Sequence, residues 1–215
     1  MISRRLTTLL LACCLLALGL AGQAQAFGGD YVVHGGSAAE RAELSAALDA
    51  SSFDWSLVPA RIDIHLAPDT QTYAAPGQIW VNSKLLEAGR FSWGLVQHEY
   101  AHQVDFFLMD EAMRHKLNSL LHGVDWYGVG SPHYRRGVER FASTLAWAYW
   151  PSPQSALRPA SANDEAAAMR PARFRALMTK LLGAPQASGS FAPRHSLAFA
   201  PPEFQALALT LPFGF

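Results

Sequence analysis

The stretch GLVQHEYAHQVDFF, residues 94–107, decides the fold and points to the chemistry of this chain. It places His98 and His102 four residues apart, with Glu99 directly after the first histidine. On a helix, side chains four residues apart project from the same face at about 6 Å. Two imidazoles at that spacing can bind one zinc ion at about 2.0–2.1 Å each. Glu99 lies a part-turn away, where it can act as general base instead of ligand.

The rest of the stretch predicts a buried helix that begins with Ser92 as its N-cap. Its apolar residues recur at helical spacing: Trp93, Leu95, Val96, Tyr100, Val104 and Phe107. A buried histidine or glutamate needs a partner, and a bound cation supplies one. Asp105 lies seven residues after His98, about 10.5 Å further along the axis. We expect it to support the ligands and not to bind the ion itself.

A catalytic zinc ion needs a third protein ligand. The sequence favours Glu139, because it lies in a predicted helix over residues 134–149 whose neighbouring positions are apolar. A carboxylate in such surroundings must reach solvent or be compensated by a positive charge. His133 is the nearest alternative ligand, and Asp125 is another.

Periodicity and turn residues outline the remaining elements. Strands are predicted over residues 61–66 and 78–82, and Phe27–Gly36 is expected to be an irregular start. Helices are predicted over 38–48, where Ser37 and Glu40 form a capping box, from Ser83 to Gly89, over 110–121 and over 172–182. A loop is expected over 125–132 and a linker over 151–163. The fold class is α+β: a single domain with a small strand region followed by a mostly helical remainder.

Residues 1–26 have the features of a secretory signal peptide. Arg4 and Arg5 precede an almost entirely apolar run over residues 6–22, and Ala24-Gln25-Ala26 forms a cleavage site. We therefore expect cleavage after Ala26, a mature domain over residues 27–215, and a secreted or periplasmic protein. Both cysteines lie inside the signal peptide, so no disulfide bond can stabilise the mature chain.

Charge and hydropathy give no reason to expect nucleic acid or a membrane as a partner. Without Arg4 and Arg5 the chain has 15 basic and 17 acidic residues, a formal charge of −2. This balance gives no reason to expect binding to nucleic acid. No later segment is long and apolar enough to span a bilayer, so we expect no stable membrane insertion after cleavage. We also expect a monomer.

The motifs resemble those of the gluzincin branch of zinc metallopeptidases. Within that branch the chain is most similar to the catalytic domain of anthrax-lethal-factor-like peptidases. Those domains have an HExxH helix with an aspartate three residues later, matched by Asp105. A Tyr-Gly element follows, matched by Tyr127-Gly128, and then a helix bearing Glu-x-Phe-Ala, matched by Glu139–Ala142. Ser143 stands where thermolysin-like relatives carry an aspartate, so that branch fits less well.

The resemblance implies a zincin-like fold in which His98, His102 and Glu139 bind zinc and Glu99 is the general base. It also implies a tyrosine that donates a hydrogen bond to the oxyanion. The family places this tyrosine seven residues before the glutamate, where this chain has Pro132. Tyr134, five residues before, and Tyr127, twelve before, are the two candidates, with Tyr134 slightly preferred for its closeness to Glu139.

The expected function is that of an exported zinc-dependent endopeptidase. Water activated by zinc attacks the peptide carbonyl while Glu99 takes its proton. The expected partner is a peptide or protein substrate. Gln78–Asn82 is either an edge strand that pairs with the substrate by β-augmentation or an ordinary core strand, and the sequence leaves both open. The alternative is a secreted zinc-binding or interaction protein without catalytic activity on the same scaffold.

Overall fold

Four short strands form one sheet in the order β1-β2-β4-β3 in the computed structural model, which describes residues 29–183. They are β1 (Tyr31–Gly35), β2 (Ile62–Ala67), β3 (Tyr73–Ala75) and β4 (Gln78–Asn82). β1, β2 and β4 are parallel, and β3 pairs antiparallel with β4. Helix α2 (Ala38–Asp49) supplies the crossover that the parallel neighbours β1 and β2 require.

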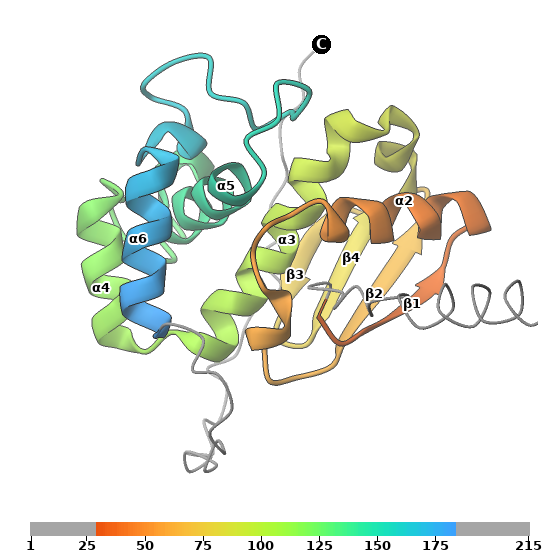
Figure 1. The fold of residues 1–215 in the computed structure, drawn as a ribbon, viewed down its shortest axis with the longest axis horizontal. Helices are drawn as coiled ribbons and strands as arrows, with labels where there is room; N and C mark the ends of the chain where they lie inside the picture. Colours follow the sequence, from red (N-terminus) through yellow and green to blue (C-terminus); the bar gives the residue numbers. More distant parts are fainter. Residues whose placement is uncertain (1–28, 184–215) are drawn as a thin grey trace, which may run out of the picture.

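One face of the sheet is buried in the core. Along β2, Ile62, Ile64 and Leu66 are buried, whereas Asp63 and His65 between them are half-buried. This alternation follows from the two-residue period of a strand. Figure 1 shows α2 lying against the sheet. The capping box of Ser37 and Glu40 at its start is present, as the sequence predicts.

Four stacked rings form a row across the opposite face of the sheet. His34 lies opposite His65, His65 opposite Trp80, and Trp80 opposite Tyr73. Neighbouring ring centroids are 4.5–5.2 Å apart, and the ring planes are within 19° of parallel. Cross-strand pairs of this kind stabilise a sheet by about 0.2–1 kcal/mol each. The row therefore joins all four strands.

Helix α3 (Arg90–Leu108) carries the HExxH motif through the centre of the molecule. Figure 1 shows the sheet and α2 on one side of it and the other long helices on the other side. Its middle residues are buried all round, as expected of a helix packed on several sides. The helix begins two residues before Ser92, after Gly89, whose positive φ of 55° suits a residue without a side chain. The predicted N-cap role of Ser92 is therefore wrong.

The remainder is helical, and the α+β fold class is confirmed. Its helices are α4 (Glu111–Leu120), α5 (Gly137–Tyr149) and α6 (Pro171–Leu182). Four short 3-10 helices complete the described chain: η1 (Trp55–Leu57), η2 (Ser83–Ala88), η3 (His133–Arg135) and η4 (Glu165–Ala167). None of the helices between residues 29 and 183 has the length and apolar character needed to cross a bilayer. The expected signal peptide lies outside the described residues.

Two expectations about the strands are wrong. Tyr31–Gly35 forms β1 and is not an irregular start. β4 is not an edge strand, because the short strand β3 pairs along its outer side. The sequence does not predict β3, because three residues are too few to show the alternation of a strand.

Candidate metal centre

Helix α3 brings the two histidines of the motif together. His98 and His102 are 5% and 3% exposed, and their Nε2 atoms are 3.2 Å apart. Two donors on a tetrahedral zinc ion at about 2.0–2.1 Å lie about 3.3 Å apart. The two nitrogens are thus spaced as ligands of a single ion would be.

Helix α5 delivers Glu139 to the same point. Glu139 is 1% exposed, and its Oε2 lies 3.2 Å from His98 Nε2 and 3.5 Å from His102 Nε2. The three atoms form a nearly equilateral triangle with the side length expected of zinc ligands. The third-ligand residue favoured by the sequence therefore lies beside the histidine pair.

His133, the alternative third ligand, joins the same cluster from η3. Its Nε2 lies 3.1 Å from Glu139 Oε2. The donor atoms of His98, His133 and Glu139 all lie within 4.8 Å of one another, so this buried group could hold a metal ion. The sequence weighed His133 against Glu139, but the structure brings both to the centre.

The charge balance of the cluster suits a cation. Burial raises the pKa of Glu139, but the charges and hydrogen bonds of His102, His133 and His98 outweigh it and hold that pKa well below its usual range. Burial lowers the pKa of His133, but hydrogen bonds to Glu139 and Glu165, with their charges, raise it to about 10. The carboxylates thus draw positive charge to the site, as protons or as a metal ion.

Glu99 is the least compensated group of the cluster. It is 4% exposed, and its Oε2 is buried without a hydrogen-bond partner among the described residues. Burial raises the pKa of Glu99, against the opposing charges of His98 and His102. A buried carboxylate oxygen without a partner is costly in a purely structural role. Together with the spacing of the donor atoms, this unpartnered oxygen fits a site that could hold a metal ion.

Glu165 and Ser143 form an outer layer that sequence reasoning missed. Ser143 Oγ donates to Glu165 Oε2 at 2.6 Å and lies 3.0 Å from His98 Nδ1. Glu165 Oε1 lies 2.7 Å from His133 Nδ1. Glu165 follows the predicted linker over 151–163, where no motif or period distinguishes it from a solvated glutamate.

Asp105 anchors the loop after α4 to the HExxH helix. Its Oδ1 accepts hydrogen bonds from Arg114 Nε at 2.8 Å and Trp126 Nε1 at 3.2 Å. Its Oδ2 accepts one from the Tyr127 hydroxyl at 3.1 Å. Asp105 is fully buried. Burial lowers the pKa of His102, but the charge and hydrogen bond of Glu139 and the charges of Glu99 and Asp105 outweigh it and raise that pKa. Within the described chain, the hydrogen-bond partners of the Asp105 side chain are Arg114, Trp126 and Tyr127 and not the candidate ligands, so its expected support of the ligands stays a prediction.

The same loop fixes the start of α5. The carbonyl oxygens of Asp125 and Trp126 accept hydrogen bonds from the amides of Gly137 and Val138 at 2.8 and 3.0 Å. A Cβ on Gly137 would lie 2.8 Å from Trp126 Cε3 and still closer to Asn118 Oδ1, so only glycine fits here without a shift of its neighbours. Glu139, two residues later, is placed by this backbone pairing.

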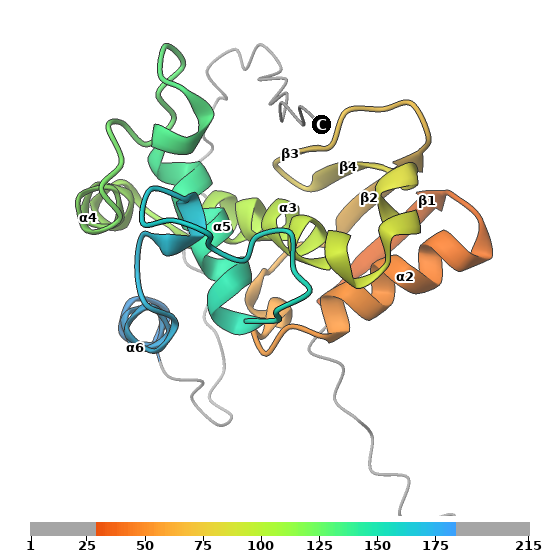
Figure 2. The same ribbon diagram turned by 90° about the horizontal axis from the view of Figure 1, so that it is seen from above.

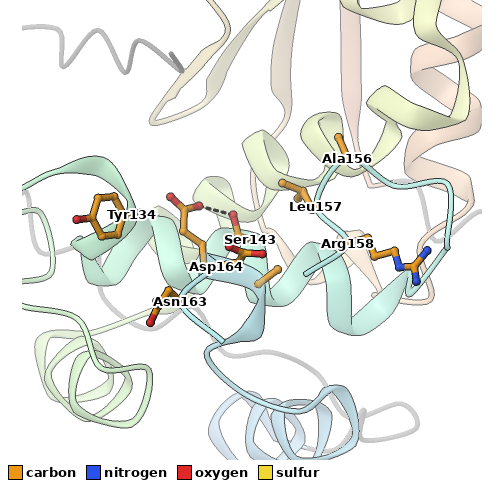
Figure 3. A pocket seen from close by; sticks show the side chains of 9 residues that line it. Tyr134, Ser143, Ala156, Leu157, Arg158, Asn163 and Asp164 are labelled. Atoms are coloured by element: carbon orange, nitrogen blue, oxygen red, sulfur yellow. Dashed lines mark hydrogen bonds between the residues drawn. The ribbon is translucent and has the colours of Figure 1, made fainter. Parts of the chain in front are cut away.

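The two candidate tyrosines lie in different surroundings. The Tyr127 hydroxyl is bonded to Asp105, whereas Tyr134 is 53% exposed. Tyr134 lines a pocket of about 370 Å³ whose wall also contains Ser143 and Glu165. Figure 3 shows the Tyr134 hydroxyl directed away from Ser143. Neither tyrosine hydroxyl has a hydrogen bond to the histidine cluster within residues 29–183.

Comparison of the chain with protein-family models, with curated proteins and with solved structures finds no match.

Proposed function

We propose that this chain is an exported zinc-dependent endopeptidase with a zincin-like active site. One observation carries the proposal. The donor atoms of His98, His102 and Glu139 form a buried triangle with sides of 3.2–3.5 Å, next to the unpartnered carboxylate oxygen of Glu99. Zinc suits this donor set, because it favours nitrogen and carboxylate ligands in tetrahedral geometry.

The residues divide the chemistry between them. When bound, zinc would act as a Lewis acid that polarises the substrate carbonyl and lowers the pKa of water. Glu99 Oε2 accepts the proton of the attacking water and later donates it to the leaving amine. Burial suits Glu99 to this task, because it raises the pKa of a carboxyl group toward neutrality.

The substrate backbone pairs with β3, the strand with an open edge beside α3. Gln103 fixes this strand relative to the motif. Its Nε2 donates to the carbonyl oxygens of Ala75 and Gln78 at 2.9 and 3.2 Å, and its Oε1 accepts from the Gly77 amide at 2.9 Å. Gln103 directly follows His102, and Figure 2 shows β3 beside α3. An extended peptide can add to such an edge by main-chain hydrogen bonds.

Tyr134 remains the preferred donor to the oxyanion. It is exposed and follows His133, which belongs to the cluster. The Tyr127 hydroxyl is already engaged with Asp105. A half-exposed side chain can change rotamer toward a bound substrate without breaking a buried contact.

One observation favours a second function, that of a metal-binding protein without catalytic activity. His133 Nε2 lies 3.1 Å from Glu139 Oε2 and could add a fourth protein donor. Four protein ligands are typical of structural zinc sites, whereas catalytic sites keep one position open.

Purified protein tests both functions. Bound zinc is quantified, and cleavage of a peptide library is compared between the wild type and Glu99→Gln. The peptidase proposal requires zinc in both proteins and cleavage by the wild type alone. Zinc without cleavage in either protein would support the second function. Sequencing the N-terminus of the protein recovered from the exported fraction tests export, and we expect it to begin at Phe27.

A further inference from the structure

Glu165 touches two parts of the metal centre through its two carboxylate oxygens. Oε1 lies 2.7 Å from His133 Nδ1, and Oε2 accepts the hydroxyl proton of Ser143 at 2.6 Å. The same Ser143 oxygen lies 3.0 Å from His98 Nδ1. One side chain thus connects histidines on two different elements, α3 and η3.

The direction of these hydrogen bonds follows from the chemistry of the groups. A carboxylate only accepts hydrogen bonds, so the Ser143 proton points to Glu165. Ser143 Oγ can then only accept from His98, which requires a proton on His98 Nδ1. The same reasoning requires a proton on His133 Nδ1. In neutral imidazoles this leaves both Nε2 lone pairs available on the side facing Glu139.

We propose that Glu165 is a positioning residue that sets the tautomer and the ring orientation of both His98 and His133 for binding the cation. This inference rests on the metal centre of the proposed function, with His133 as the additional donor described there, but not on peptide cleavage. A carboxylate that accepts the other ring N–H of a ligating histidine fixes its orientation and increases its basicity. Here one carboxylate does this twice, once directly and once through a serine hydroxyl.

Glu165 lies on the opposite side of the two imidazole rings from Glu139. Glu165 and Ser143 line the pocket shown in Figure 3, in which their hydrogen bond is dashed. The Nε2 atoms of His98 and His133 face Glu139, while their Nδ1 atoms face this outer layer. Glu165 therefore contacts the cluster on the Nδ1 side of these rings, away from the Nε2 atoms that face Glu139.

The substitution Glu165→Gln keeps the size of the side chain but removes its charge and one acceptor oxygen, whereas Ser143→Ala leaves the charge of Glu165 in place. A glutamine side chain has one oxygen and one NH₂ group, so it cannot accept from Ser143 and His133 at the same time. If its NH₂ group faces Ser143, the serine proton turns to His98 Nδ1 and moves the imidazole proton to Nε2. If the amide is reversed, His133 loses its acceptor. Either arrangement misdirects one of the two histidines.

The experiment measures metal affinity by competition with a chromophoric chelator, and the visible spectrum of the Co²⁺-substituted protein. We expect Glu165→Gln and Ser143→Ala each to weaken zinc binding by about 10- to 100-fold and to alter the Co²⁺ bands. The double variant should bind about as weakly as Glu165→Gln alone, because Ser143 acts through Glu165. Glu87→Gln makes the same chemical change at an exposed position and should bind zinc like the wild type.

The inference would be overturned if both single variants bound zinc within twofold of the wild-type affinity. It would also be overturned if the fold-losses of zinc affinity in the two single variants multiplied fully in the double variant. Ser143→Ala, a small change, keeps the test decisive if Glu165→Gln fails to fold. Weakened binding in a protein that cleaves no peptide would support the inference while refuting the peptidase. Wild-type protein that binds neither Zn²⁺ nor Co²⁺ would refute both.

Discussion

The Tyr127 hydroxyl donates a hydrogen bond to Asp105 Oδ2 at 3.1 Å, which joins the loop after α4 to the C-terminal part of the HExxH helix. The same carboxylate also accepts from Arg114 and Trp126. The tyrosine of the Tyr-Gly element therefore has a structural partner in the described chain.

Tyr127→Phe should lower the free energy of unfolding by about 1 kcal/mol, because it removes one hydrogen bond to a buried carboxylate that keeps two others. Urea denaturation of the wild type and the variant measures this difference. An unchanged urea midpoint would show that the bond contributes nothing to stability.

Tyr134→Phe should leave stability nearly unchanged but lower the catalytic rate. Its side chain is 53% exposed, so stability should change by less than about 0.5 kcal/mol. If Tyr134 donates to the oxyanion, kcat should fall by about 10²- to 10³-fold while bound zinc stays constant. Steady-state kinetics with zinc quantification tests this. An unchanged kcat would remove Tyr134 from the proposed site.

Gly137→Ala should destabilise the protein by about 1–3 kcal/mol, because the added methyl group overpacks the contact with Trp126 at the start of α5. Gly130→Ala is the matched control, since a Cβ there meets no atom within 4 Å. Thermal unfolding of both variants gives the comparison. Equal melting temperatures would contradict the close approach of Gly137.

Glu139→Ala should weaken zinc retention at least tenfold, as expected when a ligand is lost. Glu111→Ala, on the exposed side of α4, should retain zinc like the wild type. Dialysis against a chelator followed by metal analysis measures retention. If Glu139→Ala kept zinc as firmly as the wild type, the third ligand would be His133 or Asp125.

Raising the pH should destabilise the metal-free protein between about pH 6.5 and 10. Burial lowers the pKa of His133, but hydrogen bonds to Glu139 and Glu165, with their charges, raise it from 6.5 to about 10 in the folded state. A raised folded pKa contributes stability that is fully present below the unfolded pKa and is lost as the pH rises through the folded value.

Urea midpoints across this pH range, with a chelator present, test the pH effect. The control is His133→Gln, which has no proton to lose and should show a flatter profile. Parallel profiles for the two proteins would assign the pH dependence to other groups.

The sequence predicted the parts of the site that lie on long helices. HExxH spacing fixed which face of α3 carries His98 and His102, because helical geometry alone determines that relation. Glu139 could be predicted as a ligand because a charged residue among the apolar positions of a helix needs a compensating positive charge. The class of fold followed from the same periodicities.

The sequence could not predict how loops bring distant residues together. Glu165 belongs to a three-residue 3-10 helix, and its meeting with His133 depends on the path of residues 151–164. The exclusion of β4 from the sheet edge depends on β3, whose three residues show no alternation. Both features arise from tertiary pairing, which no local period encodes.

The connection from Asp105 through Trp126 to Val138 has a consequence for the binding of a metal ion at the cluster, if the proposed function is correct. It is made entirely of protein hydrogen bonds and spaces the two helices that carry the ligands. Because no ion takes part in this connection, it can hold the candidate ligands close together before an ion arrives. An arriving ion would then meet a preorganised set of donors and would have to shed its hydration shell and displace bound protons.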